Sequence, residues 1–168
     1  MGGRAPAEQL GARLAEVVID AVLASPRQWA IDTAAPIVAT RRSAIEVVDG
    51  LRELDFGELE GRTYDDIASE LPELWSAWMR TPTAVRFPGG ESYDDLRVRV
   101  HAAVSRLVHR HQGRTVLAVT HEGVARSTLA AVLGMPNAHI FRIDQRYGAL
   151  NVFDFYDDGT PLVRLING

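Results

Sequence analysis

The chain has 168 residues, contains no cysteine and no lysine, and carries a formal net charge of -4. Its composition, 46% hydrophobic and 24% charged, is that of a folded domain and argues against disorder or a fibrous repeat. Without cysteine there is no disulfide bond, thiolate metal site or cysteine nucleophile, and without lysine there is no Schiff base. The negative charge argues against a nucleic-acid partner.

Membrane and export signals are absent from the sequence. No apolar run reaches the roughly 20 residues that a membrane-spanning helix needs. Residues 1–6 also lack the apolar segment of a secretory signal. We therefore expect no membrane partner, a cytoplasmic location, and either a monomer or a small oligomer such as a homodimer.

The hydrophobic pattern alternates along the first third of the chain. Apolar residues at helical spacing predict helices, and short apolar runs predict buried strands. The expected elements are a helix over 7–17, a strand over 20–24, a helix over 27–39, a strand over 45–48 and a loop over 52–61.

Two helix starts are marked by an oxygen-bearing residue with an acid three positions later, Thr63 with Asp66 and Ser92 with Asp95. Pro72 predicts that the first of these helices is divided in two. The remaining expected elements are a loop over 80–90, a helix over 92–111, a strand over 115–120, a helix over 124–133, and strands over 150–155 and 162–166 that form a hairpin. This alternation predicts an α/β fold with helices on both faces of a mainly parallel sheet.

Ligands of open α/β sheets bind beyond the carboxyl ends of the strands. His121 follows the strongest predicted strand and begins a helix, whose free N–H groups and partial positive charge suit a phosphate. The alternative is that His121 only caps that helix. Glu53 lies between Leu51 and Leu54 just after a strand, and a partly buried carboxyl there can have a raised pKa and act as a general acid. The alternative is an exposed loop acid.

Other chemistries find little support. No histidine pair has the spacing of a metal site. The serines lack the glycines of a nucleophile elbow, and no glycine-rich dinucleotide fingerprint is present. We predict no metal and no cofactor.

Five stretches occur in a distinctive order along nearly the whole chain. They are residues 3–15, residues 25–26 with 32–34, residues 51–57 with 59–61, residues 88–92 with 99–100, and residues 119–124. This ordered set resembles the histidine phosphatase superfamily, in its phosphoglycerate-mutase-like branch. The resemblance implies a three-layer sandwich, one domain over 1–168, and a lid insert over 63–90.

The resemblance also implies roles for individual residues. That family hydrolyses or transfers phosphate through a phosphohistidine. Glu53 would be the general acid and base, and His121 the second histidine of the pocket, which stabilises charge on the phosphoryl group. The backbone amide of Glu122 would help to hold the phosphate. The implied ligand is a small molecule, either a phosphomonoester or phosphate.

The sequence departs from the family pattern in two places. No Arg-His-Gly motif is present, although the family carries its nucleophilic histidine in that motif at the end of its first strand, so the resemblance implies that this strand is missing. Trp29 stands where the family has a phosphate-binding arginine, and a neutral indole offers no bidentate fork. Arg27 is close in sequence, and we name it together with Trp29 as a candidate substrate-binding residue, although inside a helix it would point about 200° away from position 29.

The missing strand has a structural consequence. In the family it lies beside the strand that precedes His121. The strand over 115–120 would then expose an unpaired apolar edge, which proteins usually cover. We expect that a neighbouring strand closes the gap, or that a second chain or another segment covers it.

Three functions remain open. The first is a phosphatase acting on a small phosphomonoester through Glu53 and His121. The second is a catalytically inactive binding or regulatory domain, which Trp29 and the missing nucleophile favour. The third is a repurposed enzyme in which Glu53 and His121 transfer protons on an unphosphorylated ligand, to which an apolar Trp29 is suited.

Overall fold

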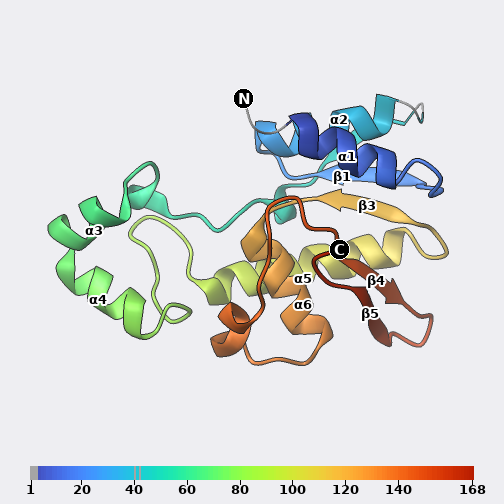
Figure 1. The fold of residues 1–168 in the computed structure, drawn as a ribbon. Coiled ribbons are helices and arrows are strands. Elements are labelled where there is room, and N and C mark those ends of the chain that lie inside the picture. The colour runs from blue at the N-terminus through green and yellow to red at the C-terminus, as the bar shows by residue number, and fades with distance from the viewer. Residues whose placement is uncertain (1–3, 40, 42) are drawn as a thin grey trace.

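The computed structural model describes residues 4–39, 41 and 43–168 (Figure 1). The strands are β1 Ala21–Ala24, β2 Ile45–Val47, β3 Val116–Val119, β4 Val152–Phe155 and β5 Pro161–Leu165. They form two sheets, a parallel one with the order β2-β1-β3 and the antiparallel hairpin of β4 and β5. The predicted parallel sheet and terminal hairpin are confirmed.

The helices also follow the predicted order. They are α1 Arg4–Arg13, α2 Gln28–Ala39, α3 Tyr64–Glu70, α4 Pro72–Arg80, α5 Tyr93–Arg110 and α6 Glu122–Val132, with short 3-10 turns η1 Asp49–Leu51, η2 Gly57–Leu59 and η3 Asn137–Arg142. Within the described ranges, none of the helices combines the length and the hydropathy needed to cross a membrane.

The prediction that the first helix ends at residue 17 was wrong. The periodicity placed Val17 on the buried stripe of a helix over 7–17, but α1 ends at Arg13 and Val17 is 42% exposed. Gly3, which begins the first of the five stretches, lies outside the described residues.

Helices cover both faces of the parallel sheet, as expected for a three-layer arrangement (Figure 1). Successive side chains of a strand point to opposite faces. Val22 and Ala24 of β1 accordingly pack with Ala30 of α2 on one face. Leu23 points the other way and belongs to the larger core, which includes Leu96 of α5.

Both predicted helix starts are confirmed as reciprocal capping boxes. The Thr63 and Ser92 side chains each accept a bond from the backbone N–H three residues on, and the acid there bonds back. Pro72 occupies the first turn of α4, so the insert contains two helices as predicted. They project away from the sheet (Figure 1). That residues 63–90 act as a lid stays a prediction.

The three parallel strands end at a common edge. Ala24 of β1 is paired with Val47 on one side and with Val119 on the other. The chain therefore leaves all three strands at the same end of the sheet. Ser25, which follows β1, and His121, which follows β3 by two residues, are brought together there.

The outer edge of β3 differs from one expectation. β1 is paired with one edge of β3, and no strand of the described chain is paired with the other, because β4 and β5 form their own sheet. The expectation that a neighbouring strand closes this gap was therefore wrong. A hairpin can satisfy its inner hydrogen bonds alone and need not join the parallel sheet. Cover by a second chain or another segment stays a prediction.

Candidate active site

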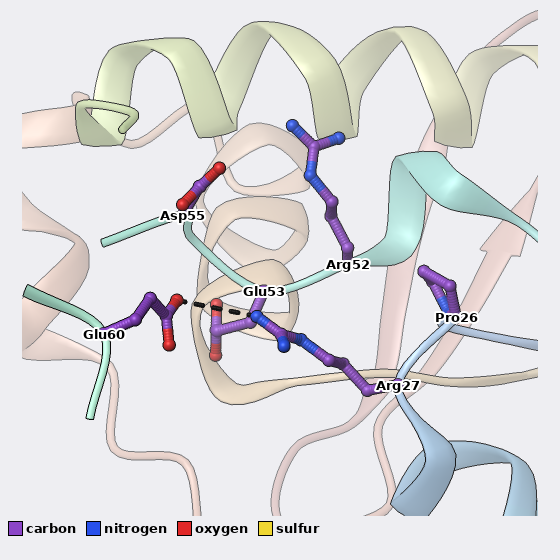
Figure 2. Close-up of a pocket in the computed structure, with 6 residues that line it drawn as sticks. All are labelled: Pro26, Arg27, Arg52, Glu53, Asp55 and Glu60. Atoms are coloured by element: carbon purple, nitrogen blue, oxygen red, sulfur yellow. Dashed lines mark ion pairs between the residues drawn. The ribbon is translucent and has the colours of Figure 1, made fainter. Parts of the chain in front are cut away.

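A pocket of about 400 Å³ lies just beyond the strand ends. It is lined by Pro26, Arg27, Arg52, Glu53, Asp55 and Glu60 (Figure 2). These residues come from the segment after β1 and from the loop after β2. The pocket therefore forms at the edge where ligands of parallel α/β sheets bind.

Glu53 is held by two backbone amides. Its Oε1 accepts a hydrogen bond from the N–H of Leu54 at 2.8 Å, and its Oε2 accepts one from the N–H of Gly123 at 3.1 Å. Burial raises the pKa of Glu53, although both amides oppose this rise. The Glu122 carboxylate adds to the rise and the Arg99 charge opposes it. Glu53 is thus partly buried with a raised pKa and is not an exposed loop acid, while its role as a general acid stays a prediction.

His121 is buried, and its side chain is bonded to Ser25. Its Nε2 lies 2.6 Å from the Ser25 Oγ, which itself accepts a bond from the Arg27 N–H at 3.3 Å. We assign the serine proton to the bond with His121, so Nε2 accepts and the ring carries its proton on Nδ1. Burial lowers the pKa of His121 to about 4, helped by the charges of Arg27 and Arg99.

His121 precedes the first residue of α6, but its side chain makes no capping bond to that helix. The alternative in which it only caps the helix is therefore wrong. At neutral pH the ring is uncharged. To stabilise a phosphoryl group as a cation, it has to leave Ser25 and gain a proton.

Trp29 packs directly against His121. The two ring centroids are 4.5 Å apart, and the rings meet edge to face at 82°. Trp29 lies in the first turn of α2 and remains 43% exposed. Trp29 therefore covers one side of the buried histidine.

The expected rotation of about 200° between Arg27 and position 29 does not apply. It assumed that Arg27 is part of a helix, but α2 begins at Gln28. Arg27 lines the pocket and its NH2 forms an ion pair with Glu60 at 3.5 Å (Figure 2). Both side chains are about half exposed.

Arg52 was not singled out from the sequence, although it lines the pocket. Figure 2 shows its side chain directed toward α5. There it is bonded to Asp49 at 2.9 Å and to Glu91 at 3.0 Å. Arg27 is thus the more available of the two pocket arginines.

Glu122 opens α6. Its carboxylate is ion-paired with Arg126, one helical turn further on. Within the described residues no acceptor bonds to the Glu122 N–H, which leaves this amide at the helix start able to bind an anion.

Sequence reasoning missed Ser25, Asp55 and Glu60 as members of the site. Ser25 follows a predicted strand and lies in one of the five ordered stretches, and these two facts were the available signals. Asp55 accepts from the Gly57 N–H and Glu60 pairs with Arg27, contacts that only the folded loop creates. Among the described residues, no group of three His, Asp or Glu side chains could hold a metal ion.

The chain is similar to several known proteins. The family model for the histidine phosphatase superfamily (branch 1) matches residues 2–168. The bifunctional protein Rv2228c of Mycobacterium tuberculosis is 38% identical over 151 residues, which are 89% of this chain and 41% of that protein. The adenosylcobalamin/alpha-ribazole phosphatase of Escherichia coli is 30% identical over 141 residues, 83% of this chain and 70% of that protein.

Solved structures agree with these matches. The alpha-ribazole phosphatase of Shigella flexneri superposes with a TM-score of 0.90 at 26% identity, covering 98% of this chain and 81% of that one. Bacillus stearothermophilus YhfR gives a TM-score of 0.90 at 31% identity, covering 97% and 81%. The chain spans about two fifths of the length of the mycobacterial proteins to which it is 38% identical, since it covers 41% of each.

Proposed function

Because this chain belongs to the histidine phosphatase superfamily, we propose that it binds the phosphate group of a small phosphomonoester and that Glu53 transfers protons during hydrolysis. The observation that supports this most is that the Glu53 carboxyl has a raised pKa and lines the same pocket as Arg27. A carboxyl with a raised pKa is suited to give and take a proton near neutral pH.

The phosphate would bind between Arg27 and the start of α6. Among the described residues, Arg27 is held only by a half-exposed ion pair, so an anion can compete with Glu60 for it. The Glu122 N–H is a hydrogen-bond donor at the start of α6, where the positive end of the helix dipole also favours an anion. A phosphate dianion close to His121 would raise the pKa of that histidine and favour its release from Ser25.

In this reaction Glu53 acts twice. Water attacks the phosphorus as the ester phosphorus–oxygen bond breaks, and Glu53 as an acid protonates the leaving ester oxygen. The Glu53 carboxylate then recovers a proton from the water that has attacked, so the products are the alcohol and inorganic phosphate. The family's Arg-His-Gly motif, with its nucleophilic histidine, is not in this sequence. We therefore expect phosphate binding with turnover well below that of an enzyme with both histidines.

A second candidate is a binding domain without catalysis. The observation that favours it is the packing of His121 between the Ser25 hydroxyl and the Trp29 ring, which occupies the imidazole in the free protein. In that case the ligand would bind at the same pocket and remain unchanged.

Two measurements separate these functions. Binding of inorganic phosphate is measured by calorimetry for the wild type and Arg27→Gln, and hydrolysis of a chromogenic aryl phosphate is measured at mildly acidic pH. Hydrolysis is compared with Glu53→Gln and His121→Ala, and Glu58→Gln is the matched control because Glu58 is an exposed acid of the same loop that does not line the pocket.

Phosphate binding that Arg27→Gln weakens, with hydrolysis lost in Glu53→Gln and His121→Ala alone, supports the enzyme. The same binding without hydrolysis in any protein supports the binding domain. Failure of the wild type to bind phosphate contradicts both.

A further inference from the structure

The guanidinium of Arg99, on α5, has all five of its N–H donors engaged. Its Nε donates to Glu91 Oε1 at 2.8 Å, and one NH2 donor reaches Glu91 Oε2 at 2.6 Å. The other three donors bind backbone carbonyls, those of Gly50 at 3.0 Å, Arg52 at 2.9 Å and Glu53 at 3.2 Å. Five donors in a planar fork are the full capacity of an arginine.

Three of these contacts fix the backbone on which Glu53 stands. Two of the carbonyls belong to Gly50 and Arg52, just before Glu53 in the chain, and the third is the carbonyl of Glu53 itself. The segment 50–53 has no regular sheet or α-helix partner beyond the short turn η1, so Arg99 replaces the hydrogen bonds that secondary structure would supply.

Glu91 holds Arg99 in this orientation. Its carboxylate accepts both Arg99 bonds side by side, and also accepts from Arg52 NH2 at 3.0 Å and from the Asp55 N–H at 3.1 Å. The Arg99 and Glu91 side chains are only 14% and 13% exposed. Burial by itself would raise the pKa of Glu91, but the bonds from Arg99 and Asp55 hold it below its usual value.

We infer that Arg99 and Glu91 form a clamp that positions the Glu53 carboxyl between the Leu54 and Gly123 amides. Glu91 and Arg99 both belong to one of the five sequence stretches, residues 88–92 with 99–100, which neither the pocket nor the proposed chemistry uses directly. They touch no pocket atom that would react, so both are positioning residues. The inference rests on the proposed function because Glu53 is the group whose proton transfer the clamp serves.

An arginine is needed here for its shape as well as its charge. A lysine ammonium is a single point with three donors, and it cannot reach two carboxylate oxygens and three carbonyls at once. Arg99→Lys therefore keeps the positive charge and releases part of the backbone. Arg99→Gln removes both.

The charged and titratable groups around Glu53 come from several elements. Arg99 and Tyr93 belong to α5, Glu122 belongs to α6, and Arg27, Arg52, Asp55 and Glu60 share the pocket. None of these except Arg99 changes in the proposed variants, so a change in Glu53 is attributable to the clamp.

The test is a pH titration of the Glu53 carboxyl by carbon NMR, with the amide signals of Leu54 and Gly123 followed in parallel. Glu53→Gln assigns the carboxyl signal. In the wild type both amides follow the Glu53 titration, because both bond to its carboxylate. In Arg99→Lys we expect the pKa of Glu53 to rise and the response of the amides to weaken, since these bonds lower that pKa. Arg99→Gln should show the same change.

Arg97→Lys is the matched control, because Arg97 lies on the same helix, is half exposed and, within the described part of the chain, pairs only with Asp94. It should leave the Glu53 titration unchanged. If the Arg99 variants do not fold, Glu91→Gln tests the same clamp, since it leaves Arg99 in place but removes one of its acceptors.

A folded Arg99→Lys protein with unchanged Glu53 pKa and unchanged amide responses overturns the inference. In that case the clamp only stabilises the fold, or acts by charge alone if Arg99→Gln still differs. Phosphate binding by the same proteins distinguishes the two proposals. A wild type that binds no phosphate refutes the function, and the clamp is still judged by the Glu53 titration.

Discussion

Glu53 and Gly123 are 70 residues apart in sequence, yet the Glu53 carboxylate lies so close to the Gly123 backbone that a Cβ at this position would clash with it. The Glu53 carboxylate accepts a hydrogen bond from the Gly123 N–H at 3.1 Å. A Cβ on Gly123 would lie 2.3 Å from Glu53 Oε1 and 3.3 Å from Leu96 Cδ2. Glycine is therefore required here because the carboxylate lies against the backbone of α6, and not because of an unusual backbone conformation.

Gly123→Ala should move Glu53 off the α6 amide. Overpacking of this kind costs about 1–3 kcal/mol, which urea unfolding of the variant would measure. The Gly123 amide should also stop following the Glu53 titration in NMR. Gly11→Ala is the control, because Gly11 lies in α1 and the nearest atom to its Cβ would be 4.0 Å away. Equal stability of both variants would contradict the close contact.

Glu53 should make stability fall as the pH rises. Its pKa is raised in the folded protein, so the folded state holds a proton that the unfolded state has already lost. This contribution is complete below the unfolded pKa and is lost as pH rises through the folded one. The difference in unfolding free energy between Glu53→Gln and the wild type should therefore grow in favour of the variant from about pH 4 to neutral pH. A difference that is constant with pH would contradict the raised pKa.

His121 should make stability fall as the pH decreases, opposite to the effect of Glu53. Its folded pKa of about 4 lies below the ordinary histidine pKa of 6.5, so the unfolded state binds a proton first as pH falls. Its stabilising contribution is complete above pH 6.5 and is lost between 6.5 and about 4. The full effect is on the order of 3 kcal/mol.

Unfolding of His121→Asn at pH 7 and pH 4.5 measures this effect. The variant should lose less stability than the wild type over that interval, and the exposed His101→Asn should behave like the wild type. Parallel losses in wild type and His121→Asn would show that His121 is not held neutral.

Trp29→Arg should tighten phosphate binding. A guanidinium at this position places a bidentate donor beside His121, where the ring of Trp29 now packs. A charge-assisted hydrogen bond contributes about 1.5–3 kcal/mol, so affinity should improve roughly tenfold or more. Calorimetry with inorganic phosphate measures it, and Trp29→Leu removes the ring without adding the charge. Equal affinity of the two variants would show that position 29 does not face the phosphate.

The unpaired edge of β3 predicts association with a second copy. Strand edges with free backbone groups pair readily, and lysine on such an edge prevents pairing. Sedimentation analysis should find a dimer for the wild type and a monomer for Ala118→Lys, since Ala118 is exposed in the middle of β3. A monomeric wild type at high concentration would exclude cover by a second copy.

Local patterns in the sequence determined the order of the elements. Thr63 and Ser92 begin helices because each is followed three residues later by the aspartate that completes its capping box. Pro72 divides the insert into two helices because a proline interrupts the helix at its own position. Glu53 and His121 could be named as candidates for a similar reason, since each follows a predicted strand and strand ends mark the ligand edge of the sheet.

Only the tertiary structure decided what surrounds those two residues. Ser25 and His121 are 96 residues apart, and Arg99 donates hydrogen bonds to carbonyls 46 to 49 residues away in the sequence. Hydrogen bonds of such span leave no periodic signal in the sequence, because they depend on how the helices and strands pack together. The state of His121 and the support of Glu53 were therefore settled by packing, and the sequence alone determined the elements that bring them close.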